Sequence, residues 1–156
     1  MVRIRGNNNM INVGSNCTIG PKCSFWIEGN NIEITIRDNC SFTSSVHFNA
    51  QENGSKILVG DDCMFSNNII VRTSDSHPIY DIITGKRINH AKSVFIGSHV
   101  WIAPNSKVMK GAIINDGAII GSDTIVTKEI PANSLAVGHP ALVVKSDISW
   151  SREPLF

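Results

Sequence analysis

The amino-acid sequence predicts an all-β fold, a parallel β-solenoid whose short strands wind into triangular coils. An apolar residue recurs at every sixth position from Ile96 to Val126, and small residues lie four positions after most of them. A period of six fits neither the stripe of an α-helix nor the alternation of a single strand. It fits short strands joined by tight corners, with three hexapeptides to a coil and each sixth residue in the interior.

The composition agrees with this prediction. Isoleucine and valine occur 23 and 12 times against 4 leucines, which favours pleated strands over helices. The 16 asparagines and 12 glycines suit corners that need left-handed backbone dihedrals. At 156 residues, the chain has the length of a single domain.

The same period defines the elements in chain order. A β-helix is expected over about residues 12–131, with short irregular corners at 28–35 and 49–58, then a closing segment at 132–145 and a tail at 146–156. The expected interior positions upstream of the regular run come in three triplets, which are Val13, Ile19 and Phe25; Ile36, Phe42 and Phe48; and Val59, Phe65 and Val71.

The period breaks over one long stretch, residues 73–93. The wall of a solenoid cannot absorb about twenty extra residues, so this stretch is expected to project as a loop. Long loops on a rigid scaffold are where function tends to concentrate. Residues 73–93 are therefore the first place to look for a functional site.

Four cysteines occupy one kind of position in the repeat. Cys17, Cys23, Cys40 and Cys63 each follow an expected interior residue by four positions, where small residues stand in the regular run. Buried free thiols behave as small apolar groups. We therefore interpret them as packing residues and expect neither a disulfide nor a metal site.

The charge balance excludes some partners. A formal net charge of +1 gives no electrostatic reason to expect binding to nucleic acid or to an anionic membrane. No apolar run is long enough to span a bilayer, and the first residues lack the apolar region of a secretory signal. A cytoplasmic protein is expected.

Four ordered segments carry a family resemblance, which extends over roughly residues 12–145. The segments are Asp75-Ser76-His77-Pro78-Ile79, Ile96-Gly97-Ser98-His99-Val100-Trp101-Ile102, Val126-Thr127-Lys128-Glu129-Ile130-Pro131 and Val137-Gly138-His139-Pro140-Ala141. Together they resemble the hexapeptide-repeat acyltransferases, specifically the acetyl-CoA-dependent O-acetyltransferases of sugars and bacterial surface polysaccharides. Trp101 also follows His77 at the spacing that the resemblance implies.

The resemblance implies a left-handed β-helix and a catalytic role for His77. Imidazole suits the removal of a proton from a sugar hydroxyl as that hydroxyl attacks the thioester directly. Asp75 stands two residues away and is a candidate to orient the ring, although it could equally cap the loop. The indole N–H of Trp101, or a backbone N–H near it, is a candidate donor to the oxyanion that forms.

Cofactor contacts also follow from the resemblance. The pantetheine arm is expected along the coil wall and the phosphates near lysines, with Lys110 as an alternative phosphate ligand. The matching positions are Trp101, Ala103, Pro104, Ser122, Thr127, Lys128 and Lys145.

Acceptor contacts are less defined. Related enzymes carry an asparagine near the acceptor, and His47 and Asn49 both stand in that neighbourhood, so the choice between them stays open. His90, in the projecting loop, is a third candidate. The sequence does not identify the acceptor sugar.

The resemblance further implies a homotrimer with the CoA groove between adjacent subunits. Two other classes of function stay open: an N-acetyltransferase of amino sugars, and a β-helix protein that is either non-catalytic or resembles carbonic anhydrase. In the last case His77, His90 and His99 would be the zinc ligands. The match at Trp101 and Thr127-Lys128 favours CoA chemistry without a metal.

Overall fold

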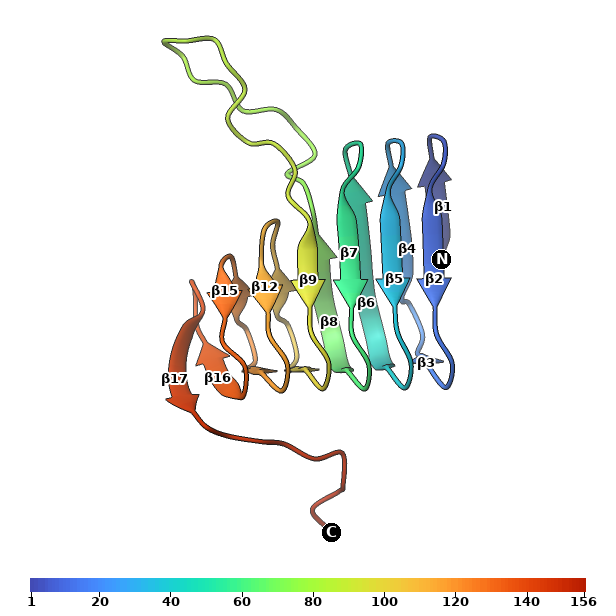
Figure 1. Cartoon of the computed structure of the whole chain (residues 1–156), viewed down its shortest axis with the longest axis vertical. Helices are drawn as coiled ribbons and strands as arrows, with labels where there is room; N and C mark the ends of the chain where they lie inside the picture. Colours follow the sequence, from blue (N-terminus) through green and yellow to red (C-terminus); the bar gives the residue numbers. More distant parts are fainter.

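The computed structural model describes all 156 residues and contains β-strands but no helices (Figure 1). The strands stack as successive coils along one axis, with the N-terminus at one end of the stack and β17 at the other. The strands are β1 (Val2–Arg5), β2 (Met10–Val13), β3 (Thr18–Ile19), β4 (Ser24–Glu28), β5 (Glu33–Ile36), β6 (Ser41–Gln51), β7 (Lys56–Val59), β8 (Met64–Arg72), β9 (Val94–Ile96), β10 (Trp101–Ile102), β11 (Lys107–Val108), β12 (Ile113–Ile114), β13 (Ile119–Ile120), β14 (Ile125–Val126), β15 (Glu129–Ile130), β16 (Ser134–Val137) and β17 (Leu142–Ser146).

The coil has three faces of parallel strands. The first face consists of β1, β4, the second halves of β6 and β8, β11 and β14. The second face consists of β2, β5, β7, β9, β12 and β15. The third face consists of β3, the first halves of β6 and β8, β10, β13 and β16. We call the turns after these faces the first, second and third corners.

The coils differ in length between the two halves of the chain. Ser24 pairs with His47 in the next coil, so the N-terminal coils repeat every 23 residues. In the C-terminal half, Ser98 binds Asp116 of the next coil, which gives a repeat of 18 residues, the expected three hexapeptides. The extra residues lengthen the strands and turns at the first corner, where the irregularities at 28–35 and 49–58 lie. The projecting loop leaves the coil at this same corner.

Side chains at the second corner form a ladder along the coil axis. The Asp38 carboxylate accepts a hydrogen bond from the Ser15 amide at 2.7 Å, and the Asp61 carboxylate accepts one from the Asp38 amide at 3.1 Å. The Ser98 hydroxyl and the Asp116 carboxylate continue the ladder. Each rung satisfies a backbone N–H that the turn leaves without a strand partner.

The corners use the residues that tolerate left-handed dihedrals. Asparagine, aspartate and glycine provide most of these positions, as the composition predicted. At the second corner the φ angles are positive at Asn16, Asn39, Asp62, His99 and Asn133.

The interior contains one apolar core of 29 buried residues. Four phenylalanine rings pack together in its N-terminal half; Phe25 and Phe48, for example, lie 5.3 Å apart between ring centroids. The expected interior positions are buried with two exceptions, Val13 and Ile19, which are 40% and 45% exposed. These two lie in the first coil, which has no further coil of this chain to cover it.

The cysteines, like the apolar interior residues, are buried except in the first coil. Cys23, Cys40 and Cys63 are buried, while Cys17 in the first coil is half-buried, and all four are free thiols. The Cys40 thiol donates to the Gly60 carbonyl at 3.1 Å, and the Cys63 thiol to the Gly97 carbonyl at 3.1 Å. The prediction that they pack in small interior positions is confirmed for the three buried ones and holds only partly for Cys17.

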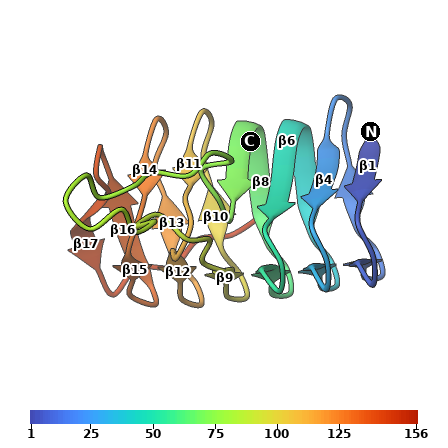
Figure 2. The same ribbon diagram turned by 90° about the horizontal axis from the view of Figure 1, so that it is seen from above.

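Residues 73–93 project from the first corner as an arm that leans toward the C-terminal coils (Figures 1 and 2). Its two legs are joined by an antiparallel bridge between Tyr80 and Arg87. Ile82 and Ile83 at its tip are 97% and 91% exposed.

Parallel coiling already begins with β1, upstream of the expected start near residue 12. At the other end β17 pairs antiparallel with β16, and the tail then runs back along the second corner as an extended segment. The structure contains no helix with the length and apolarity needed to cross a bilayer.

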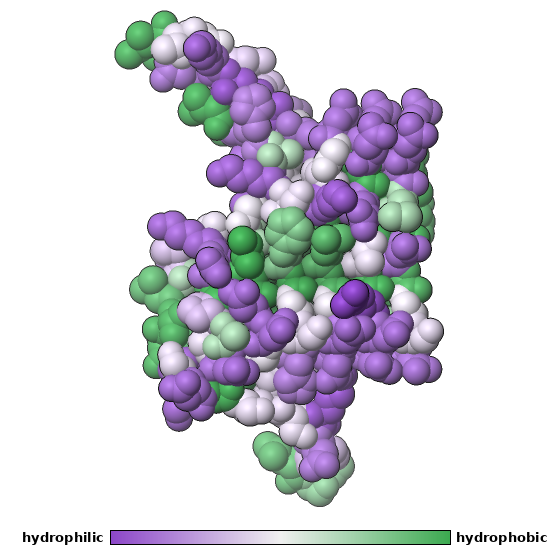
Figure 3. Space-filling model, in the orientation of Figure 1, coloured by the Kyte–Doolittle hydropathy of each residue, from purple (hydrophilic) through white to green (hydrophobic).

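An apolar band crosses the second face of the coil (Figure 3). Phe95 and Ile113 in this band are 41% and 38% exposed, and Leu58 lies beside them in a shallow groove. Exposed apolar surface of this kind marks contact sites between proteins.

Candidate active site

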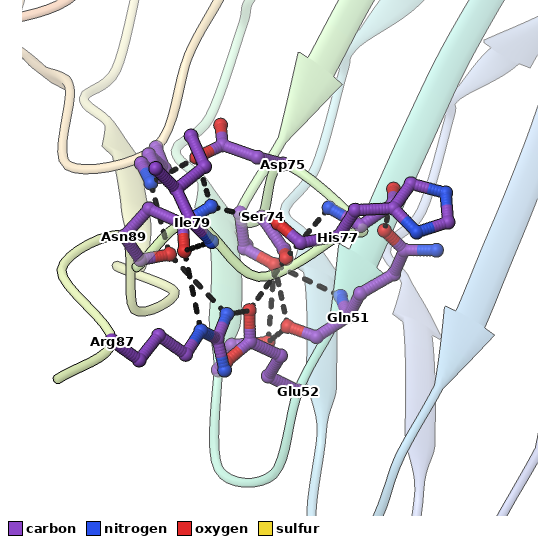
Figure 4. A network of polar contacts seen from close by, with 12 residues as sticks. Gln51, Glu52, Ser74, Asp75, His77, Ile79, Arg87 and Asn89 are labelled. Atoms are coloured by element: carbon purple, nitrogen blue, oxygen red, sulfur yellow. Dashed lines mark hydrogen bonds and ion pairs between the residues drawn. The ribbon is translucent and has the colours of Figure 1, made fainter. Parts of the chain in front are cut away.

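His77 lies at the base of the projecting arm, soon after β8 ends at Arg72 (Figure 4). Its side chain is exposed and makes no hydrogen bond within the chain. Ser76 before it has a left-handed φ of 69°, and Pro78 follows it. The imidazole is therefore presented to solvent with both ring nitrogens available.

Polar contacts tie the base of the arm to the preceding coil. The Ser76 hydroxyl donates to the Gln51 side chain at 2.6 Å and accepts from Arg72 at 3.1 Å. The Glu52 carboxylate accepts from the Ser74 hydroxyl and from the Arg87 guanidinium, both at 2.6 Å. These bonds fix the segment that carries His77 beside the end of the first face (Figure 4).

Asp75 takes part in this network in a way that the sequence did not indicate. Its carboxylate binds the Lys110 ammonium and the Asn89 amide, and no hydrogen bond joins it to the His77 ring. The Lys110 ammonium holds the pKa of the Asp75 carboxyl below its usual range. In this chain Asp75 fastens the arm to the turn after β11, and Lys110 is engaged there rather than free for a phosphate.

The acceptor candidates come from β6 and from the projecting arm. Asn49 is on the first face, two residues before Gln51, and its side chain makes no hydrogen bond within the chain. The His47 ring, four residues before Gln51, is held 2.7 Å from the Ser24 hydroxyl. His90, on the returning leg of the arm, is exposed beside a hollow lined by Glu52. Of the first two, Asn49 has the freer side chain.

Trp101 lies elsewhere, on the third face. Its indole N–H is buried without a hydrogen-bond partner. The ring of Trp150 from the tail lies 6.0 Å away between centroids. Because His77 stands at the first corner, the fold of this chain does not bring His77 and Trp101 together.

The remaining cofactor candidates fall into two groups. Ala103, Pro104 and Ser122 follow the third face at the third corner, where the Pro104 carbonyl accepts the amide of the next coil's Asp123 at 2.9 Å. The other group is more dispersed and exposed, with Thr127 and Lys128 after β14 at the first corner and Lys145 on β17.

The histidines considered as zinc ligands are also separated. His99 lies at the second corner, where its ring nitrogens face Asp62 and the carbonyl of Trp150. His77 and His90 lie on the arm at the first corner. No group of three His, Cys, Asp or Glu side chains within the chain is arranged to hold a metal ion.

Comparison with known proteins supports the repeat and the resemblance. Residues 93–128 match the family described as bacterial transferase hexapeptide (six repeats). The polysialic acid O-acetyltransferase of Escherichia coli O1:K1 / APEC is 42% identical over 85 residues, which cover 54% of this chain and 28% of that protein. The match therefore spans less than a third of that relative's length.

Two solved structures share the fold. The polysialic acid O-acetyltransferase OatWY superposes with a TM-score of 0.74 at 27% identity, covering 99% of this chain and 92% of that one. A galactoside acetyltransferase in complex with coenzyme A superposes with a TM-score of 0.67 at 24% identity, covering 90% of this chain and 65% of that one. The predicted left-handed hexapeptide-repeat β-helix is confirmed, as is the predicted likeness to sugar and polysaccharide acetyltransferases.

Sequence reasoning missed several residues of the site. Gln51, Glu52 and Arg87 carry no recognisable motif, and their contacts join positions up to 35 residues apart. Asn89 is buried inside a loop that has no periodicity to mark it. The sequence shows that Glu52 and Arg87 carry opposite charges, but no pattern in it indicates that they form an ion pair.

Proposed function

We propose that this chain is an acetyl-CoA-dependent O-acetyltransferase that acts on a hydroxyl of a sugar or bacterial surface polysaccharide. The observation that carries the proposal is the His77 imidazole, which stands exposed and unpaired on a firmly anchored arm base. Similarity to polysialic acid O-acetyltransferases supports the acceptor class. Location in the cytoplasm and a role in polysaccharide biosynthesis belong to the same proposal.

The proposed reaction needs one base and no acyl-enzyme. A ring nitrogen of His77 takes the proton of the acceptor hydroxyl while the hydroxyl oxygen attacks the thioester carbon. The carbon–oxygen bond forms and the carbon–sulfur bond breaks, and the imidazolium returns its proton to the departing thiolate. Asn49, on the face beside His77, is the proposed contact to the acceptor.

The residues proposed for the donor fit an acyl-CoA in one specific respect. The buried Trp101 indole N–H has no acceptor within the chain, and a carbonyl of a bound thioester or pantetheine arm would supply one. Lys128 and Lys145 are exposed cations suited to phosphate. Pro104 can contribute only its ring or carbonyl, since it has no N–H.

The separation of His77 from Trp101 supports a site shared between subunits. We propose a homotrimer in which the first corner of one subunit faces the third face of the next. The apolar band on the second face, with Phe95 and Ile113, is a further candidate for buried contact surface.

Transfer of radiolabelled acetyl groups would test the proposal. The purified chain is incubated with labelled acetyl-CoA and, separately, with neutral sugars, amino sugars, sialic acid polymers and capsular polysaccharides. Label that enters a saccharide and is released by mild alkali identifies an O-acetyl ester and supports the proposal. Alkali-stable label identifies an N-acetyltransferase, and no transfer to any acceptor contradicts both.

A further inference from the structure

Asn89 is the one buried residue between positions 75 and 93, with 7% of its surface exposed. It lies on the returning leg of the arm, opposite the segment that contains His77 (Figure 4). A buried amide in an otherwise exposed loop needs partners for all its polar atoms, because an unpaired one costs stability. The hydrogen-bond partners of Asn89 show which part of the arm it fixes in place.

The Asn89 side chain makes four hydrogen bonds. Its amide nitrogen donates to the His77 carbonyl at 2.8 Å and to the Asp75 carboxylate at 2.9 Å. Its amide oxygen accepts from the Ile79 N–H at 2.7 Å and from the Arg87 guanidinium at 3.2 Å. A primary amide offers two donor hydrogens and two acceptor lone pairs, so its full capacity is used.

Two of these bonds enclose the His77–Pro78 unit. The His77 carbonyl and the Ile79 N–H are the backbone groups on either side of Pro78, which has no N–H of its own. One amide group therefore holds both ends of the segment that carries the imidazole. On the other side of His77, the Ser76 hydroxyl is fixed to Gln51 at 2.6 Å.

We propose that Asn89 is a positioning residue for His77 and sets the placement of the imidazole relative to the acceptor hydroxyl. The inference rests on the proposed role of His77 as general base. Asn89 acts through the backbone and touches neither substrate nor donor. An error of about 1 Å in such a placement can cost about 100-fold in rate.

The test compares Asn89→Ala with Asn89→Leu, which keeps nearly the volume and shape of asparagine but has no polar atoms. Both variants are expected to lower kcat by about 10- to 100-fold, with KM for acetyl-CoA changed by less than about twofold. Lys86→Ala, on the exposed tip of the arm, is the matched control and is expected to keep wild-type kcat. If Asn89→Leu restores kcat, or if only KM changes, Asn89 fills space and the proposal is wrong.

Amide hydrogen exchange gives a readout that does not depend on activity. The Ile79 amide is expected to be protected in the wild-type chain and to exchange at least about tenfold faster in either variant. An unprotected Ile79 amide in the wild type would overturn the proposal even if both variants failed to fold. A wild-type rate of acetyl transfer in His77→Ala would instead overturn the proposed function, whatever Asn89 does to the exchange of Ile79.

Discussion

The Trp150 indole lies flat against the His99 imidazole, with 4.1 Å between ring centroids and 8° between ring planes. The indole N–H donates to the His99 carbonyl at 2.8 Å. The two His99 ring nitrogens face the Asp62 carboxylate at 2.6 Å and the Trp150 carbonyl at 3.0 Å. Both partners can only accept, so both bonds exist together only when the imidazole carries two protons.

This contact fixes the tail along the second corner, next to Trp101 at the start of the third face. Arg152 continues it by binding the Asp62 carboxylate at 2.7 Å and the Cys63 carbonyl at 2.8 Å. Burial raises the pKa of the Asp62 carboxyl, but the Arg152 and His99 hydrogen bonds outweigh burial and hold it below its usual value. The tail thereby shields Trp101.

Trp150→Ala should therefore uncover Trp101. In a Trp26→Phe background, where Trp101 is then the one tryptophan left, acrylamide quenching should be stronger with Trp150→Ala than with Trp150→Phe, because alanine loses the ring that lies 6.0 Å from Trp101. Equal quenching of the two variants would show that the tail does not cover Trp101.

Trp101→Ala should impair the use of acetyl-CoA. KM for acetyl-CoA is expected to rise by about 10-fold, the scale of one lost hydrogen bond with its ring contacts, while the proposed trimer still forms. Steady-state kinetics and sedimentation analysis measure the two effects. Dissociation to monomers, with kinetic constants otherwise unchanged, would make Trp101 an interface residue instead.

Lys110→Met should weaken the chain in a pH-dependent way. Lys110 lowers the pKa of Asp75 in the folded state, so the pair stabilises the fold above the unfolded pKa of about 3.9 and loses this effect as the pH falls through the lower folded pKa. The side chains are 22% and 33% exposed, which limits the effect to about 1 kcal/mol.

Urea unfolding at about pH 7, 5 and 3 measures this effect. The difference in unfolding free energy between wild type and Lys110→Met should be largest at neutral pH and shrink at the lowest pH. Lys107→Met, an exposed lysine in the adjoining strand β11, is the control and should show no such trend. A difference that stays constant with pH would mean that Lys110 acts through packing alone.

Thiol labelling tests the position of the cysteines in the coils. Cys17, in the uncovered first coil, should react first, and the three buried thiols should react only as the chain opens. Cys63→Ala should be mild, since a small group is removed, whereas Cys63→Arg would bury an unpaired charge and abolish folding. Rapid labelling of Cys40 and Cys63 in the native chain would contradict the register of the first three coils.

The interior of this fold was predictable because each coil needs apolar interior residues at the same spacing. Ile102, Val108 and Ile114 face the axis at fixed spacing, so the period alone identifies them. The longer N-terminal coils were less visible, because the extra residues lie at the first corner and leave the interior triplets intact. Val13 and Ile19 were wrongly expected to be buried, because the period does not show which coil lacks a neighbouring coil to cover it.

The site was only partly predictable. The His77–Pro78 pair stands out because it opens the one long break in the period. The roles of Asp75, Lys110 and Asn89 depend on how the two legs of the arm meet, which no local pattern encodes. The role of Trp150 was also missed, because its contact with His99 joins residues 51 positions apart and no local pattern indicates it.

The most direct measurement is acetyl transfer from acetyl-CoA to an accepted saccharide by His77→Ala, compared with wild type and with His90→Ala on the same arm. Loss of a general base should lower kcat by about 100- to 10,000-fold in His77→Ala. His90→Ala should keep kcat and change at most the KM for the acceptor. Turnover by His77→Ala within about threefold of wild type, in a chain that folds normally, would remove His77 from the mechanism and contradict the account.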